Sequence, residues 1–169
     1  MKILLAILFA FIALLTRLSF PPDGKLGEHE ASVALPASFC YKRVTDPGTY
    51  PRWMTGTKSV EVRYPPSETN VGNRFVITLD YGFLGTLDVD VVVVGAKEYQ
   101  YYAIDLDNWL RLRMEFEIKP VDELKSKLIM RVVSKRNSFF FKHFVHPFAH
   151  LYYSNWVTQA LLSFQLRYS

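Results

Sequence analysis

The central part of the chain alternates apolar and polar residues with a period of two, which is typical of β-strands that bury one face. In the clearest example Leu112, Met114 and Phe116 fall on one side of the strand, and Arg113 and Glu115 fall on the other. Turn signals rich in Pro, Gly, Asp and Asn recur about every ten residues, as in an antiparallel meander. The predicted strands of this part are 60–64, 74–81, 87–94, 99–106, 110–119 and 125–134.

A further strand and two short helices are predicted before this meander. Residues 29–35 read as the first strand, and Pro36 stands where helices favour a first residue. A helix over 37–44 then ends before Asp46-Pro47-Gly48, because the residue before a proline avoids the helical conformation. A second helical turn over 49–54 is ended by Gly56.

The last thirty residues predict one long helix over 138–167, with Ser138 as its N-cap. Apolar residues cover nearly the whole circumference of this helix, so it must be covered by a sheet, a membrane or a bound apolar molecule. A half-polar antiparallel sheet needs its apolar face covered, and this helix is the large apolar element available. The pattern therefore predicts an α+β fold in which a seven-stranded antiparallel sheet wraps around the C-terminal helix.

The N-terminus carries an apolar run over 3–15 that follows Lys2. The run has the length of a signal-peptide core, and with Leu18 and Phe20 it just reaches the length of a membrane span. We interpret 1–20 as a hydrophobic signal or signal-anchor segment, 21–27 as a linker and 28–169 as the folded domain. The sequence favours a single N-terminal anchor in an endomembrane or cell envelope; the alternatives are secretion after signal cleavage, and a helix packed into the core.

Composition narrows the class of protein further. With 169 residues the chain has room for one domain, and its formal net charge of +4 is not gathered in a basic run, so we expect no nucleic-acid partner. The only cysteine, Cys40, rules out an internal disulfide framework.

Three stretches resemble the opening of START-like domains, the SRPBCC superfamily that includes Bet v 1 allergens, polyketide cyclases and coenzyme Q-binding proteins. They are Val33-Ala34-Leu35-Pro36-Ala37, the segment Val-Thr-Asp-Pro-Gly-Thr-Tyr-Pro-Arg-Trp-Met over 44–54, and Ser59-Val60-Glu61-Val62. The order of predicted elements matches over roughly 28–167. The resemblance implies a helix-grip fold that holds a hydrophobic ligand between the sheet and the last helix, with chemistry there in a minority of members.

The side chains that face each other across sheet and helix define the candidate cavity. Asn155, Gln159, Tyr81 or Tyr102 would orient a ligand in it. Trp53 either guards the mouth or packs the short helices onto the sheet, and the protein's own aromatic side chains could fill the space instead. The residues predicted to line the cavity are Trp53, Phe75, Ile77, Leu79, Tyr81, Val89, Val91, Tyr102, Ile104, Leu112, Met114, Phe116, Phe148, Tyr152, Asn155 and Trp156.

Catalytic and metal chemistry find little support in the sequence. No serine lies in the context of a nucleophile elbow or triad, so we predict no catalytic residue and no cofactor. His143, His146 and His150 have helical spacing, but Pro147 lies inside the set and no carboxylate or cysteine is near, so no metal site is predicted.

The start of the long helix instead has the composition of a segment that lies on a membrane surface. Its aromatic side chains would enter the bilayer beside basic ones, and packing of the phenylalanines into the core is the alternative. The residues predicted to contact the membrane are Phe139, Phe140, Phe141, Lys142 and Phe144.

These patterns together favour membrane-associated binding, transfer or presentation of a hydrophobic ligand such as a lipid, sterol or isoprenoid. One alternative is a polyketide cyclase or dehydratase-like enzyme that acts on a hydrophobic substrate. The other is an interaction module whose cavity is closed.

Overall fold

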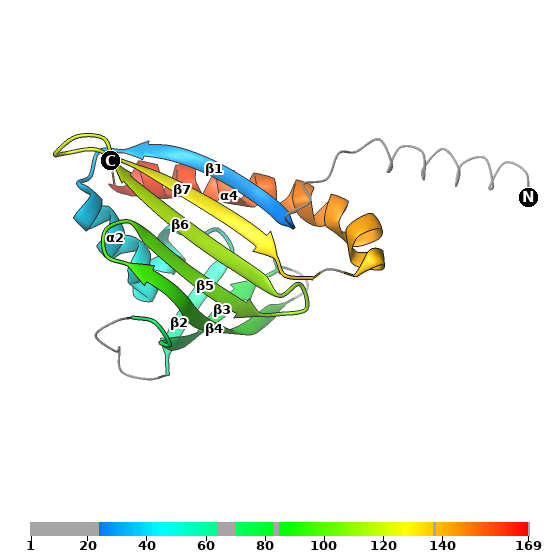
Figure 1. The fold of residues 1–169 in the computed structure, drawn as a ribbon. Coiled ribbons are helices and arrows are strands. Elements are labelled where there is room, and N and C mark those ends of the chain that lie inside the picture. Colours follow the sequence, from blue (N-terminus) through cyan, green and yellow to red (C-terminus); the bar gives the residue numbers. More distant parts are fainter. Residues whose placement is uncertain (1–23, 64–69, 83–84, 137, 169) are drawn as a thin grey trace, which may run out of the picture.

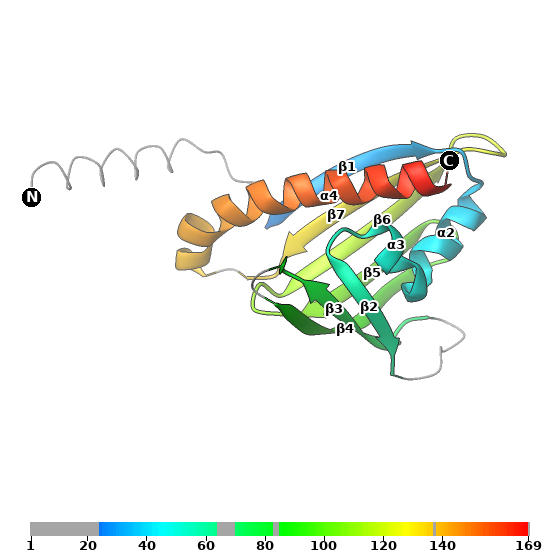
Figure 2. The same ribbon diagram turned by 180° about the vertical axis from the view of Figure 1, so that it is seen from behind.

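In a computed structural model, seven antiparallel strands form one sheet that curves around a long C-terminal helix (Figures 1 and 2). The structure describes residues 24–63, 70–82, 85–136 and 138–168. The strands follow the order β1-β7-β6-β5-β4-β3-β2, so consecutive strands from β2 to β7 are neighbours and β1 closes on β7. Their bounds are β1 (Lys25–Val33), β2 (Thr57–Val62), β3 (Arg74–Asp80), β4 (Thr86–Lys97), β5 (Tyr101–Asp107), β6 (Leu112–Pro120) and β7 (Ser126–Ser134).

The helices lie where the sequence places them. Between β1 and β2 come α2 (Ala37–Thr45), the 3-10 turn η1 (Pro47–Thr49) and the single-turn helix α3 (Tyr50–Trp53). After β7 a π-helical turn, η3 (Phe141–Val145), leads directly into α4 (His146–Tyr168). The predicted α+β class, the seven-stranded sheet, the two short helices and the long terminal helix are confirmed.

The period-two pattern correctly separates the two faces of the sheet. In β6 the side chains of Leu112, Met114 and Phe116 are buried, whereas Arg113 and Glu115 between them are partly exposed. The buried side chains face α2, α3 and α4, and together they form one continuous core. The opposite face of the sheet is polar, and ion pairs connect neighbouring strands across it.

The backbones of α4 and β1 approach closely at Gly27. A Cβ atom at this position would lie 2.7 Å from the backbone oxygen of Tyr153 in α4. Glycine therefore lets the two backbones come together along the strand that α4 mainly follows. The strand begins at Lys25, four residues before the predicted start at 29, because Lys25 and Gly27 pair with Val133 and Val132 around a β-bulge.

Within the part of the chain that the structure describes, no helix is both long and apolar enough to cross a membrane. The predicted hydrophobic segment 1–20 lies outside the described residues.

Replacing Gly27 with alanine should force α4 away from β1, because the new methyl group meets a backbone oxygen that cannot rotate aside. We expect a loss of roughly 1–3 kcal/mol in the free energy of unfolding, as for other overpacked sites. Urea denaturation followed by circular dichroism measures this loss. Ser32→Ala, at an exposed position of the same strand, is the matched control. Equal stability of the two variants would contradict the close-contact explanation.

Candidate functional site

A small cavity lies between the sheet and the middle of α4. Its volume is about 30 Å³, enough for roughly one water molecule. Three aromatic side chains from α4 form one wall, and the other walls come from the α3–β2 turn, the end of β3, the end of β5, the β5–β6 connection and β6. The lining residues are Thr55, Gly56, Leu79, Asp80, Tyr81, Leu106, Asn108, Leu112, Met114, Tyr152, Tyr153 and Trp156.

Aromatic contacts hold the mouth of this cavity closed. The indole Nε1 of Trp156 donates a hydrogen bond to the backbone oxygen of Thr55 at 2.7 Å, which ties α4 to the turn before β2. The rings of Tyr153 and Trp156 meet edge to face with centroids 6.1 Å apart, and those of Tyr152 and Tyr153 are 5.0 Å apart. A ligand larger than water must therefore displace these rings to enter.

Of the residues that the sequence places in the cavity, the structure brings six together around it. Leu79 and Tyr81 come from the β3 side, Leu112 and Met114 from β6, and Tyr152 and Trp156 from α4. Two others, Phe148 and Asn155, are exposed on the outer face of α4. The remaining eight belong to the close-packed core: Trp53, Phe75, Ile77, Val89, Val91, Tyr102, Ile104 and Phe116.

Trp53 shows why the cavity is small. The side chain is only 2% exposed, and its ring meets those of Phe116 and Phe164 at centroid distances of 6.2 and 5.1 Å. Its Nε1 donates to Thr49 Oγ1 at 3.2 Å within the short helices. Trp53 thus packs the short helices onto the sheet, which is the second of the two roles considered for it, and it fills space deep to the cavity.

Tyr153 lines the cavity although the sequence did not single it out. It precedes Trp156 by three positions on α4, so both side chains lie on the same side of the helix. This helical spacing could have predicted that Tyr153 lines the cavity. Burial raises the pKa of the Tyr153 hydroxyl well above its ordinary value.

Acid–base groups at the cavity are few. Asp80 is the one carboxylate among the described lining residues; it is exposed, and its Oδ1 accepts a hydrogen bond from the Gly82 amide at 2.8 Å. The three histidines with helical spacing do not share one face: His143 is exposed, whereas His146 is buried beside His150 with ring centroids 6.2 Å apart. The π-helical turn η3 shifts the helical register between His143 and His146. Across the described residues, no three His, Cys, Asp or Glu side chains could hold a metal ion.

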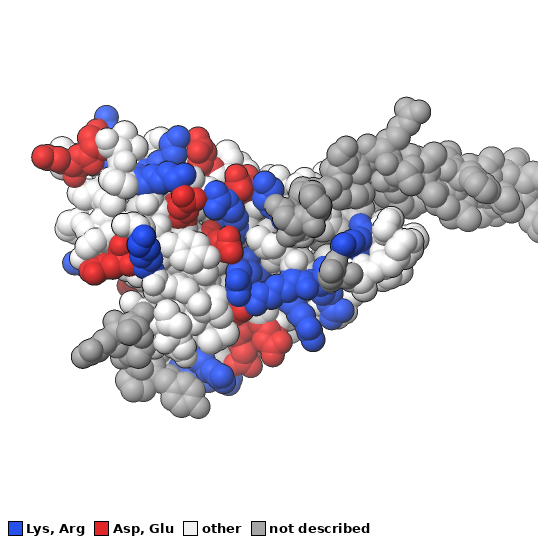
Figure 3. Space-filling view, in the orientation of Figure 1, with Lys and Arg blue, Asp and Glu red and all other residues white. Residues whose placement is uncertain are grey.

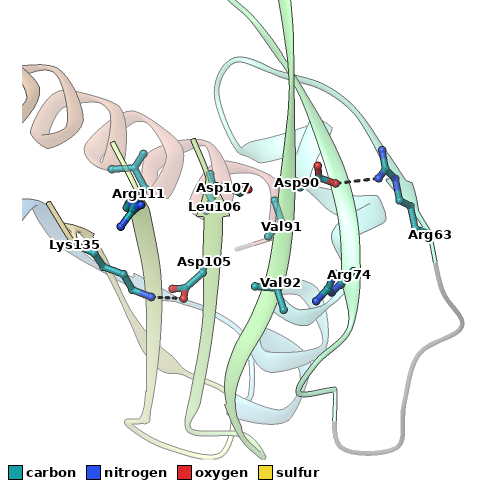
Figure 4. A pocket seen from close by; sticks show the side chains of 11 residues that line it. Arg63, Arg74, Asp90, Val91, Val92, Asp105, Leu106, Asp107, Arg111 and Lys135 are labelled. Atoms are coloured by element: carbon teal, nitrogen blue, oxygen red, sulfur yellow. Dashed lines mark hydrogen bonds and ion pairs between the residues drawn. The ribbon is translucent and has the colours of Figure 1, made fainter. Parts of the chain in front are cut away.

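A second hollow, an open groove of about 630 Å³, lies on the polar face of the sheet (Figure 4). Arg111 and Lys135 stand on one side of the groove, and Arg63 and Arg74 stand on the other (Figure 4). Asp90 pairs with Arg63 at 3.1 Å, and Lys135 pairs with Asp105. The full lining is Arg63, Arg74, Asp90, Val91, Val92, Asp105, Leu106, Asp107, Arg111, Leu112 and Lys135. Because both signs of charge alternate here, the groove is not suited to an apolar ligand.

The fold of this chain is similar to that of several proteins of known structure. The sequence matches no protein-family model and no curated protein. A START superfamily protein from Mycobacterium smegmatis is similar over 82% of this chain and 99% of its own, with 15% identity and a TM-score of 0.56. A protein from Thermus thermophilus is similar over 83% of this chain and 94% of its own, with 11% identity and a TM-score of 0.65.

A third similar structure is the di-domain ARO/CYC protein BexL from the BE-7585A biosynthetic pathway. It shares 13% identity and a TM-score of 0.64 over 83% of this chain, which spans 46% of that protein. The chain therefore has the START-like helix-grip fold that its sequence resemblance implied.

The groove also contains an ion-pair network whose pH dependence can be measured. Arg113 reaches both carboxylate oxygens of Asp105, at 2.7 and 3.2 Å, and Lys135 contacts one of them. Partial burial opposes ionisation of Asp105, but hydrogen bonds from Arg113 and Lys135 outweigh it and hold the pKa of this carboxyl below its ordinary value. The network thus stabilises the folded state while Asp105 is ionised.

Asp105→Asn should lower the free energy of unfolding at pH 7 by about 1–2 kcal/mol. A lowered pKa in the folded state gives stability that is complete above the unfolded value near about 3.9 and is lost as pH falls through the folded value. The difference between wild type and Asp105→Asn should therefore shrink below about pH 4. Denaturation across pH measures it, with exposed Asp107→Asn as control. A difference that persists unchanged at low pH would exclude the ion pairs as its cause.

Proposed function

We propose that this protein binds a hydrophobic ligand, such as a lipid, sterol or isoprenoid, between the sheet and α4, and that it works in association with a membrane. The observation that supports this most is the position of the cavity, where three aromatic side chains of α4 meet apolar side chains of β3 and β6. Phe139, Phe140 and Phe144 support the membrane association, because all three are exposed beside Lys142.

The proposal requires the site to open. The described cavity holds about one water molecule, so a chain or ring system needs the side chains of Tyr81, Tyr152 and Trp156 to move outward. Each buried methylene contributes about 0.8 kcal/mol, so a ligand with many of them offsets the separation of a few aromatic contacts. Met114, which is buried at the floor, would then contact the ligand.

Two other functions each have one supporting observation. The similarity to ARO/CYC structures favours a cyclase-like enzyme acting in the same cavity. Against it, the one carboxylate at the described cavity is exposed and bonded to a backbone amide. The small volume favours a closed interaction module.

Native mass spectrometry of the protein after incubation with lipid extract tests the binding proposal. We expect wild type to retain a lipid at a stoichiometric level and Met114→Trp to lose it, since the larger ring would occupy the floor of the site. Val62→Trp, on the exposed edge of the sheet, controls for the added indole.

Retention by both variants would place the lipid elsewhere. A wild-type protein that retains no lipid, and converts none, would favour the closed module.

A further inference from the structure

One end of the molecule exposes a group of large aromatic side chains. They come from the β5–β6 connection, from the residues before η3, from η3 itself and from the first turn of α4. We call this group the aromatic end: Trp109 (58% exposed), Phe139 (73%), Phe140 (62%), Phe144 (45%) and Phe148 (58%). Contiguous exposed apolar surface of this kind usually marks an interaction site.

The aromatic end is held in place by specific contacts. Phe141, predicted to contact the membrane, is instead 2% exposed and packs edge to face against Trp109, with ring centroids 6.4 Å apart. The guanidinium of Arg136 lies 4.9 Å from the ring centroid of Trp109, and its Nε donates to the backbone oxygen of the same residue. Phe140 and Phe144 stack with centroids 5.3 Å apart. These contacts therefore hold the segment that carries the exposed rings in a fixed position.

Basic side chains lie beside these rings. Arg136 comes shortly before η3, Lys142 lies within it, and Arg111 follows Trp109 by two residues. Arg111, Arg136 and Lys142 form no ion pair with a described carboxylate. Figure 3 shows lysine and arginine side chains forming a band that runs toward the end of the molecule where η3 lies, while acidic ones alternate with basic ones elsewhere on this face.

The point at which the chain enters the described domain also lies at the aromatic end. β1 begins at the end of the sheet where η3 lies (Figures 1 and 2), and the Ser134 amide donates to the backbone oxygen of Gly24 at 2.9 Å. The described chain thus begins at the aromatic end, and the apolar run over 3–15 precedes it in the sequence. Stable membrane association generally needs two such signals acting together.

The exposed surface also leads to the candidate cavity. Phe140, Phe144, Phe148 and Tyr152 follow one another at intervals of four residues, and all four are exposed. Tyr152, the last of them, lines the cavity mouth. The exposed apolar side chains thus continue from the aromatic end along α4 to a residue that lines the cavity.

We infer that the aromatic end docks on the surface of an anionic bilayer, with the phenylalanines among the acyl chains and Arg111, Arg136 and Lys142 at the headgroups. The inference rests on the proposed function and names its partner, an anionic leaflet that delivers the ligand along α4 to Tyr152. The excess of cations favours this partner over a second copy of the chain, because two copies would bring like charges together.

Quenching of Trp109 fluorescence by brominated phosphatidylcholine tests the docking, with the full chain added to vesicles with or without phosphatidylserine. The Trp109→Phe protein gives the contribution of the other tryptophans. We expect Trp109 quenching to be strong in anionic vesicles and weak in neutral ones. The combined Arg111→Gln and Lys142→Gln changes should reduce the docked fraction about fivefold for each cation.

Replacing Phe139, Phe140 and Phe144 together with serine should abolish the quenching. The matched control is Val121→Ser with Leu124→Ser, since both side chains are exposed in the β6–β7 turn at the opposite end of the sheet. Equal quenching in neutral and anionic vesicles, or none, would overturn the inference. The inference would also be overturned if no quenching occurred and the protein formed a dimer that the three serine changes dissociate.

Lipid retention by the same serine variant, measured by native mass spectrometry from detergent solution, separates docking from ligand binding. We expect retention to be unchanged, because none of the three phenylalanines lines the cavity. Wild type that retains lipid but shows no quenching would refute the bilayer inference alone, whereas wild type that retains no lipid would refute the proposed function.

Discussion

The contact between α4 and β1 is the constraint on which the rest of the structure depends. At Gly27 the two backbones approach so closely that a methyl group has no room, and this fixes the height of α4 above the sheet. Because α4 follows the β1 edge, its flank toward β3 and β6 is left to define the cavity. The side of the helix turned away from the sheet stays in solvent although many of its residues are apolar.

Most of the fold could be predicted because period-two alternation depends on only one buried face. Strand ends were less predictable. Gly95 reads as a stop, yet β4 continues to Lys97, since a bulge between Val93 and Gly95 lets the strand keep pairing with β5. β1 likewise extends to Lys25 through a bulge. Such irregularities depend on the partner strand, which a single stretch of sequence does not contain.

The candidate site was only partly predictable, for a different reason. Alternation identified the inward side chains, but the volume left between them depends on how the buried rings of Tyr50, Trp53 and Phe164 pack against one another in the core. On the helix side, η3 shifts the register by a π-helical turn. This shift accounts for the inward position of Phe141 and the separation of His143 from His146, neither of which an ideal helical wheel provides.

The closed cavity and the exposed helix are two consequences of one arrangement. In water, α4 covers the cavity with Tyr152, Tyr153 and Trp156 while Leu151 and Leu162 remain outside. Burying those outer side chains in a bilayer would gain roughly 25 cal/mol for each Å² of apolar surface removed from water. Separating Trp156 from Thr55 loses one hydrogen bond, worth about 1 kcal/mol net. Under the proposed function, a bilayer would therefore supply free energy that offsets opening and that water does not supply, so the same helix would seal the site in solution and release it at a membrane.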